Sequence, residues 1–130
     1  PADVAIVVLG VNDATRLTSL ADWERELSAL AGSIREKTGA RLVMLTGAPP
    51  LERFPGLPAP LCWLLGLRAR ALRAVQSNLA EADPALGFAA VLHPMPYDFC
   101  EDLFHPSGAG YAAWAAMTAA STAELLRESS

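Results

Sequence analysis

One short stretch near the amino terminus constrains the fold more than any other. Residues 4–9 (Val-Ala-Ile-Val-Val-Leu) are six consecutive apolar residues, four of them β-branched. This pattern predicts a strand that is buried on both faces of a parallel sheet. The run ends at Gly10, and the short polar side chains of Asn12 and Asp13 follow directly. In open α/β sheets, chemistry occurs at the carboxyl ends of the strands, so we expect Asn12 to stand in a functional cleft.

The remaining chain alternates helical and strand patterns. A Ser-x-x-Asp capping box at residues 19–22 predicts the start of a helix, and Gly39 is in the position that commonly ends one. Residues 14–17 are expected to form a loop, and residues 128–130 to fray. The expected strands cover residues 4–9, 41–46 and 88–92, and the expected helices cover residues 19–39, 67–82 and 107–128. Strict alternation of this kind favours parallel βαβ units in an α/β fold.

Residues 47–66 are expected to be irregular. They contain five prolines, which cannot occupy a helix interior or a central strand. The segment follows the carboxyl end of a strand and is long for such a connection, which predicts a loop that borders the cleft. Its apolar residues either form a wall of an acyl-binding pocket or attach the loop to the domain. These residues are Phe54, Leu57, Leu61, Trp63 and Leu64.

Composition excludes several classes of function. A chain of 130 residues that is 52% hydrophobic can build the core of one modest domain. The net charge of −4 argues against a nucleic-acid partner, and we expect three arginines of one helix (Arg68, Arg70 and Arg73) to form its solvated face. No apolar run is long enough to span a bilayer. Cys62 and Cys100 are expected to be free thiols.

A carboxylate and an imidazole lie three residues apart near the carboxyl terminus, at Asp102 and His105. Such a pair suits general base catalysis, because the carboxylate can orient one ring nitrogen while the other accepts a proton from a nucleophile. The pair follows the last expected strand and precedes the last helix, on the same side of the sheet as Asn12. His93 is a weaker candidate for the base, because it lacks a carboxylate at a matching spacing. His93 and Asp98 are expected only to neighbour the cleft.

Two motifs together resemble a known family. Residues 10–13 (Gly-Val-Asn-Asp) and residues 102–105 (Asp-Leu-Phe-His) resemble blocks III and V of the SGNH (GDSL-like) hydrolases in order and context. The resemblance implies a three-layer α/β/α fold with a parallel, flavodoxin-like sheet. It also implies that Asn12 contributes to the oxyanion hole, that His105 is the base and that Asp102 is its partner. The implied reaction is hydrolysis of a small carboxylic ester through an acyl-serine intermediate, without a metal or another cofactor.

The family's Gly-Asp-Ser nucleophile motif and its block II glycine both precede block III. Block III begins here at Gly10, so neither motif has room in this chain. We therefore expect residues 1–130 to be a single partial domain without its N-terminal strands. An N-terminal segment of the same protein would pair with residues 4–9 and supply the serine. The alternatives are a non-catalytic α/β binding or interaction domain and, less favoured because no Gly-rich phosphate loop follows a strand, a flavodoxin-like nucleotide binder.

Overall fold

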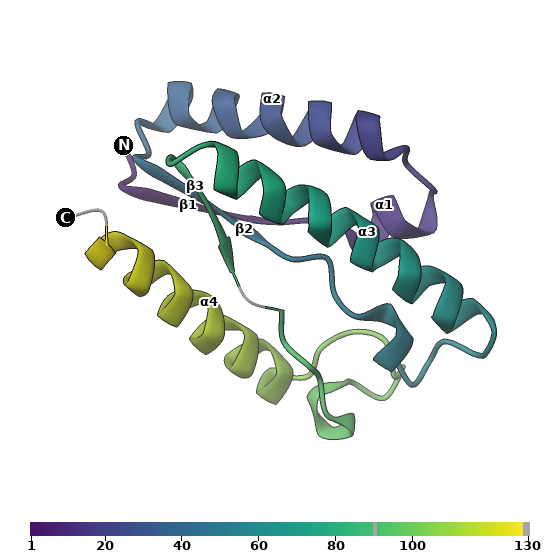
Figure 1. Cartoon of the computed structure of the whole chain (residues 1–130). Coiled ribbons are helices and arrows are strands. Elements are labelled where there is room, and N and C mark those ends of the chain that lie inside the picture. The colour runs from purple at the N-terminus through teal and green to yellow at the C-terminus, as the bar shows by residue number, and fades with distance from the viewer. Residues whose placement is uncertain (90, 129–130) are drawn as a thin grey trace.

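A computed structural model describes residues 1–89 and 91–128 as one open parallel sheet between helices (Figure 1). The strands, in the order β1-β2-β3, are β1 (Val4–Val8), β2 (Leu42–Thr46) and β3 (Leu86–Ala89). The long helices are α2 (Leu20–Thr38), α3 (Leu61–Ala82) and α4 (Gly108–Glu128). Short helical turns are α1 (Val11–Thr15), η1 (Leu51–Arg53) and η2 (Pro96–Asp98). The expected three-layer α/β/α class is confirmed.

The layers follow from the alternation of side chains along β2. Val43 and Leu45 face one side, where they join a core with residues of α2 and α3. Leu42 and Met44 face the other side and pack near α4. Figure 1 shows the same division, with α2 and α3 on one face of the sheet and α4 on the other. Two helical layers therefore bury both faces of β2, which confirms it as a buried strand.

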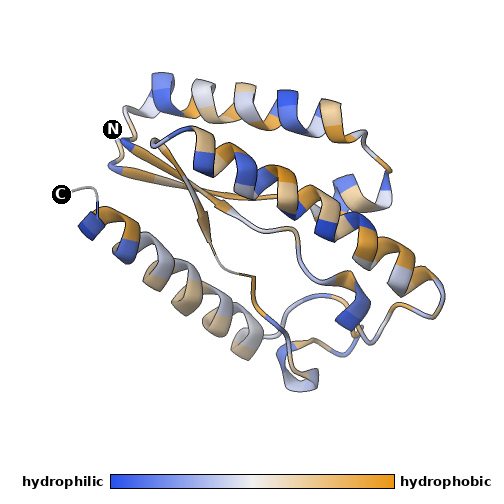
Figure 2. Ribbon diagram, in the orientation of Figure 1, coloured by the Kyte–Doolittle hydropathy of each residue, from blue (hydrophilic) through white to orange (hydrophobic). Residues whose placement is uncertain are grey.

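β1 lies at the edge of the sheet, and the prediction that residues 4–9 are buried on both faces is wrong for the described chain. Val7 is buried against the α2–α3 layer, but Ile6 and Val8 are 53% and 54% exposed. The physical reason is that α4 packs over β3, so the opposite face of β1 stays open. Figure 2 shows that β1 is as hydrophobic as β2 although only β2 is enclosed.

Three element boundaries differ from the prediction. α3 begins at Leu61, so the irregular segment is shorter than residues 47–66, and Pro60 precedes the helix where its missing N–H costs no hydrogen bond. α1 occupies part of the expected loop at residues 14–17. β3 begins at Leu86, two residues before the expected start, and ends at Ala89, so residues 91–92 do not belong to it. Glu128 lies in α4 and not in a frayed end. Residue 90 of the expected strand and residues 129–130 of the expected frayed end lie outside the described residues.

Several local predictions are confirmed. The Ser19 hydroxyl accepts a hydrogen bond from the Asp22 amide at 3.0 Å and caps α2, which Gly39 ends in a left-handed conformation. Cys62 and Cys100 are free thiols. The expected solvated arginine face is wrong for two of its three members. Arg68 is half-buried, with Nε and Nη2 shielded from solvent, and Arg73 is half-buried and donates to the carbonyl of Ala48 at 2.8 Å.

Candidate active site

The loop before α4 holds His105 against Asp102. Asp102 Oδ2 lies 2.6 Å from His105 Nδ1, while Oδ1 accepts backbone hydrogen bonds from Phe104 (3.0 Å) and His105 (2.9 Å). The hydrogen bond with the His105 side chain, followed by those two amides, lowers the pKa of the Asp102 carboxyl from 3.8 to about 2. Asp102 is therefore ionised at neutral pH. An ionised carboxylate only accepts hydrogen bonds, so Nδ1 donates, and in the neutral ring the lone pair therefore lies on Nε2.

Backbone contacts fix this loop on both sides. The carbonyl of His105 accepts from the Cys100 amide at 2.8 Å, and the carbonyl of Leu103 accepts from the Gly56 amide at 2.9 Å. The second contact joins the His105 loop to the segment that follows β2. The Ser107 hydroxyl accepts from the Gly110 amide at 3.1 Å, which confirms the predicted N-cap of α4. The imidazole is thus positioned by its own loop, by the neighbouring loop and by the start of α4.

Asn12 lies on α1, directly after β1, and its side chain is exposed. Gly10 makes the turn from β1 into α1 with φ 128°, and a Cβ there would stand 2.6 Å from that of Ala48. Only glycine fits this backbone conformation and this close approach. Asp13 Oδ1 accepts from the Thr18 hydroxyl at 3.1 Å, so this carboxylate braces the chain after α1.

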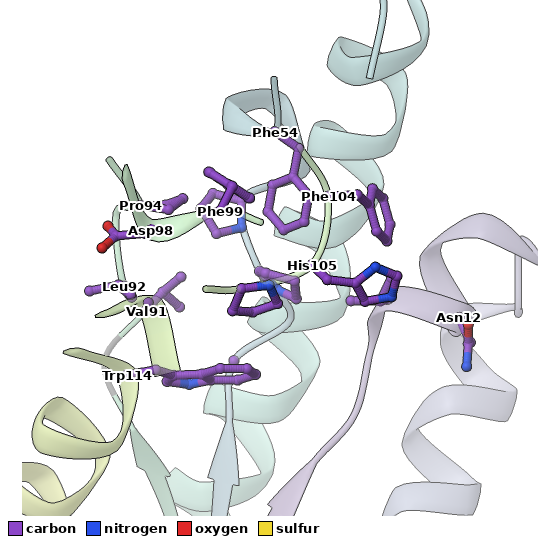
Figure 3. Close-up of a pocket in the computed structure, with 16 residues that line it drawn as sticks. Asn12, Phe54, Val91, Leu92, Pro94, Asp98, Phe99, Phe104, His105 and Trp114 are labelled. Carbon is purple, nitrogen blue, oxygen red and sulfur yellow. The ribbon is translucent and has the colours of Figure 1, made fainter. Parts of the chain in front are cut away.

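Asn12 and His105 line the same pocket, of about 300 Å³, at the carboxyl ends of the strands. Figure 3 shows both side chains toward one side of it, Asn12 from α1 and His105 from the loop. Apolar side chains dominate the rest of the wall. The pocket is lined by Val11, Asn12, Gly47, Pro49, Pro50, Phe54, Val91, Leu92, Pro94, Asp98, Phe99, Phe104, His105, Pro106, Gly110 and Trp114.

Sequence reasoning identified the polar part of this wall better than the apolar part. Of the apolar residues expected at the cleft, only Phe54 lines the pocket; Trp63 and Leu64 lie 62% and 61% exposed on α3. Trp114 was not among the residues expected at the cleft. An aromatic residue in the first two turns of a helix that starts at the site was the available signal for its position.

Of the two expected neighbours of the cleft, Asp98 lines the pocket and His93 does not. Asp98 is buried, and its Oδ2 accepts from the Met95 amide at 2.7 Å. No serine is among the residues that line the pocket in the described part of the chain. Residues 1–89 and 91–128 contain no group of three His, Cys, Asp or Glu side chains that could hold a metal ion.

Comparison with known proteins gives one match. The model of a family described as the GDSL-like Lipase/Acylhydrolase family matches residues 1–113, a range that includes Asn12, Asp102 and His105. No curated protein and no solved structure matches the chain. Within the described residues, no helix is long and apolar enough to cross a membrane.

Proposed function

The chain belongs to the GDSL-like lipase/acylhydrolase family, and from this premise we propose that it supplies the base and an oxyanion-binding residue of a serine esterase. His105 is the general base, Asp102 orients it, and Asn12 binds the oxyanion. The nucleophilic serine comes from an N-terminal segment of the same protein, outside residues 1–130. The observation that carries the proposal is the 2.6 Å contact between Asp102 and His105 on the wall of a pocket that Asn12 also lines.

The proposed reaction has two acyl-transfer steps. His105 Nε2 takes the proton of the serine hydroxyl as the serine oxygen attacks the ester carbonyl. The resulting imidazolium then gives that proton to the departing alcohol, which leaves an acyl-serine. Water attacks the acyl-serine in the same way, with its proton passing through Nε2, and releases the carboxylic acid and free serine. Asp102, ionised at neutral pH because of its lowered pKa, stabilises the imidazolium in both steps.

Asn12 suits the oxyanion because a side-chain amide carries N–H donors without a charge. A positioned donor of this type contributes roughly 3–4 kcal/mol to the stability of an acyl-transfer transition state. Its side chain is exposed and lines the same pocket as His105, which supports this assignment.

The open edge of β1 supports the position proposed for the N-terminal segment. Within the described residues no strand pairs with the outer side of β1. A groove of about 310 Å³ beside it is lined by side chains from β1, β2 and α4, including Ile6 and Val8. Parallel strands end at the same edge of a sheet, so a further parallel strand here would end next to Asn12. The serine at its end would then reach the Asn12 and His105 side of the pocket.

The second candidate is a non-catalytic binding domain on the same scaffold. It is favoured by the absence of a serine from the pocket lining of the described residues. The two candidates differ in whether a reactive serine meets His105 in the native protein.

Serine-directed labelling of the native protein separates the candidates. The intact mass of the protein is measured before and after reaction with a fluorophosphonate, and the labelled peptide is sequenced. We expect one phosphonylated serine, in a segment outside residues 1–130. The His105→Ala variant should lose the label, and His93→Ala, with a histidine outside the pocket, should retain it. A native protein that takes no label would favour the binding domain, and a label on a serine within residues 1–130 would contradict the proposed origin of the nucleophile.

A further inference from the structure

The pocket is polar at one side and apolar at the other. His105 and Asn12 stand together on one side, whereas Val91, Leu92 and Trp114 lie on the other (Figure 3). Besides Asn12 and His105, the polar groups among the described lining side chains are the carboxylate of Asp98, whose Oδ2 a backbone amide already engages, and the single indole N–H of Trp114. A group that extends from the reacting carbonyl toward Trp114 therefore meets hydrocarbon and few hydrogen-bonding partners.

The apolar side is shaped by close contacts. The ring of Phe54 meets those of Phe99 and Phe104 edge to face, with centroids 5.0 and 5.3 Å apart. Such pairs prefer this geometry, which fixes the wall next to His105. On the far side, a Cβ on Gly47 would stand 2.5 Å from Val91 Cγ2. Any larger residue at position 47 would displace Val91 and so change this wall of the pocket.

The buried side-chain amide of Gln76 fixes the backbone that forms one wall of the pocket. Gln76 on α3 is 1% exposed; its Oε1 accepts from the Ala48 amide at 3.0 Å, and its Nε2 donates to the Thr46 carbonyl at 2.9 Å. These bonds, with the Arg73 bond to Ala48, fix the chain after β2 where Pro49 and Pro50 line the pocket. The apolar volume is therefore preformed, and a ligand does not have to order it.

We propose that this part of the pocket is an acyl subsite that selects straight acyl chains of about eight to ten carbons, a specificity that rests on the proposed esterase function. The ester carbonyl lies at Asn12 and His105, and the tail runs between Val91 and Trp114. The volume of about 300 Å³ is at the small end of ligand sites. A methylene takes up roughly as much space as a water molecule in the liquid, about 30 Å³, so the pocket holds about ten carbons.

Neutral straight-chain primary amides, from acetamide to dodecanamide, are the probes for the test, with binding to the complete native protein measured by calorimetry. They carry the acyl chain and carbonyl of the substrate but cannot be hydrolysed by a simple ester route, and their binding needs no serine. Burial of one methylene raises affinity about fourfold. We expect this increment for each added carbon up to about decanamide and no further gain beyond it. Equal affinities from acetamide to decanamide would overturn the proposal.

Three variants locate the subsite. Val91→Phe should move the plateau to chains shorter by about two carbons, and Trp114→Ala should move it to longer chains. Trp63→Ala removes an exposed tryptophan outside the pocket and should leave the series unchanged. If Trp114→Ala does not fold, Val91→Phe alone decides, and an unchanged plateau in that variant would contradict the assignment.

Amide binding tests the acyl subsite and ester hydrolysis tests the esterase, so the two proposals can be overturned separately. Chain-length-dependent amide binding without any ester hydrolysis would overturn the esterase and leave the apolar subsite standing. Ester hydrolysis with the same kcat/KM for acetyl and decanoyl esters, together with a flat amide series, would retain the esterase and overturn the subsite.

Discussion

The pocket wall and the outer side of β1 belong to the same sheet, but only the pocket wall is locally complete. At the pocket, both oxygens of Asp102 have hydrogen-bond partners and the loop around His105 is tied to the segment after β2. At β1, the apolar side chains of Ile6 and Val8 are more than half exposed, and no described strand covers the outer backbone. The chain therefore carries an oriented carboxylate–imidazole pair beside an exposed apolar strand edge.

This difference indicates where a further part of the protein would act. An exposed apolar strand edge is a template for pairing with another strand, and β1 has no Lys, Pro or inward charge to prevent it. The Asp102–His105 pair needs no additional contact to be oriented. Under the proposed function, the N-terminal segment covers this edge and delivers the nucleophile to an imidazole that is already oriented.

The largest expected effect comes from separating the chain from any such segment. We expect residues 1–130 expressed alone to give no soluble, active monomer, because β1 remains an open apolar edge. Size-exclusion chromatography, thermal melting and hydrolysis of p-nitrophenyl acetate are the measurements. A monodisperse monomer with a cooperative melt would contradict the prediction that the open edge of β1 prevents residues 1–130 from folding alone. Ester hydrolysis by that monomer would show that the nucleophile lies within the chain.

Substitution of His105 tests the pocket side of the comparison, where the imidazole is proposed to act as the base. In the complete protein, His105→Ala should lower kcat for ester hydrolysis by roughly 10³-fold or more, because the serine loses its proton acceptor. The melting temperature should change little, since the His105 side chain is 69% exposed. His93→Ala is the matched control and should keep the parent activity. Near-parent turnover by His105→Ala would make the assignment of the base wrong.

Asn12→Ala should lower kcat by roughly 10²–10³-fold with little change in KM, as expected for a donor used mainly in the transition state. Asn12→Asp should be worse, because a carboxylate repels the developing oxyanion. Asn78→Ala, an exposed asparagine on α3, serves as the control. A raised KM with unchanged kcat would instead make Asn12 a residue that binds the substrate in its ground state.

Replacing one apolar side chain with alanine in β1 and one in β2 measures how well each strand is covered by the rest of the protein. In the complete protein, Leu45→Ala should cost about 2–5 kcal/mol of unfolding free energy, since Leu45 is fully buried. If a further segment covers β1, Ile6→Ala should cost a comparable amount there although Ile6 is 53% exposed in the described chain. Denaturant unfolding gives both values. A cost for Ile6→Ala of only a few tenths of a kcal/mol would indicate that the face of β1 stays open.

A fall in pH should have the smallest effect, and it should act on the free energy of unfolding. The hydrogen bond to His105 lowers the pKa of Asp102 to about 2 in the folded protein, from 3.8. A lowered pKa stabilises the folded state above pH 3.8, and this contribution is lost as the pH falls through about 2. The loss should be small, because Asp102 is exposed and solvent screens it. Urea midpoints from pH 5 to 2 for the parent and for Asp102→Asn measure it; identical pH dependence in both would contradict the lowered pKa.

Much of the fold and of the polar site was predictable from local signals. The capping box at Ser19, the glycine at position 39 and the alternation of strands with helices act over a few residues, so they identify the βαβ order without tertiary knowledge. The spacing of Asp102 and His105 is also local, and the side chains meet within one turn of the chain. The parallel sheet, the capped helices and the oriented imidazole were therefore all expected.

The sequence could not assign burial to particular strands or an apolar wall to particular residues. The run at β1 is entirely apolar and that at β2 ends in a threonine, yet the position of α4 over β3 leaves Ile6 open while Met44 is enclosed. The pocket likewise gathers Phe54, Phe99 and Trp114 from three distant segments. Amino-acid sequence determined the local pairings and helix ends, since their energies arise between near neighbours. Tertiary structure alone decided which apolar surfaces meet, because the hydrophobic effect has no direction and depends on which elements pack together.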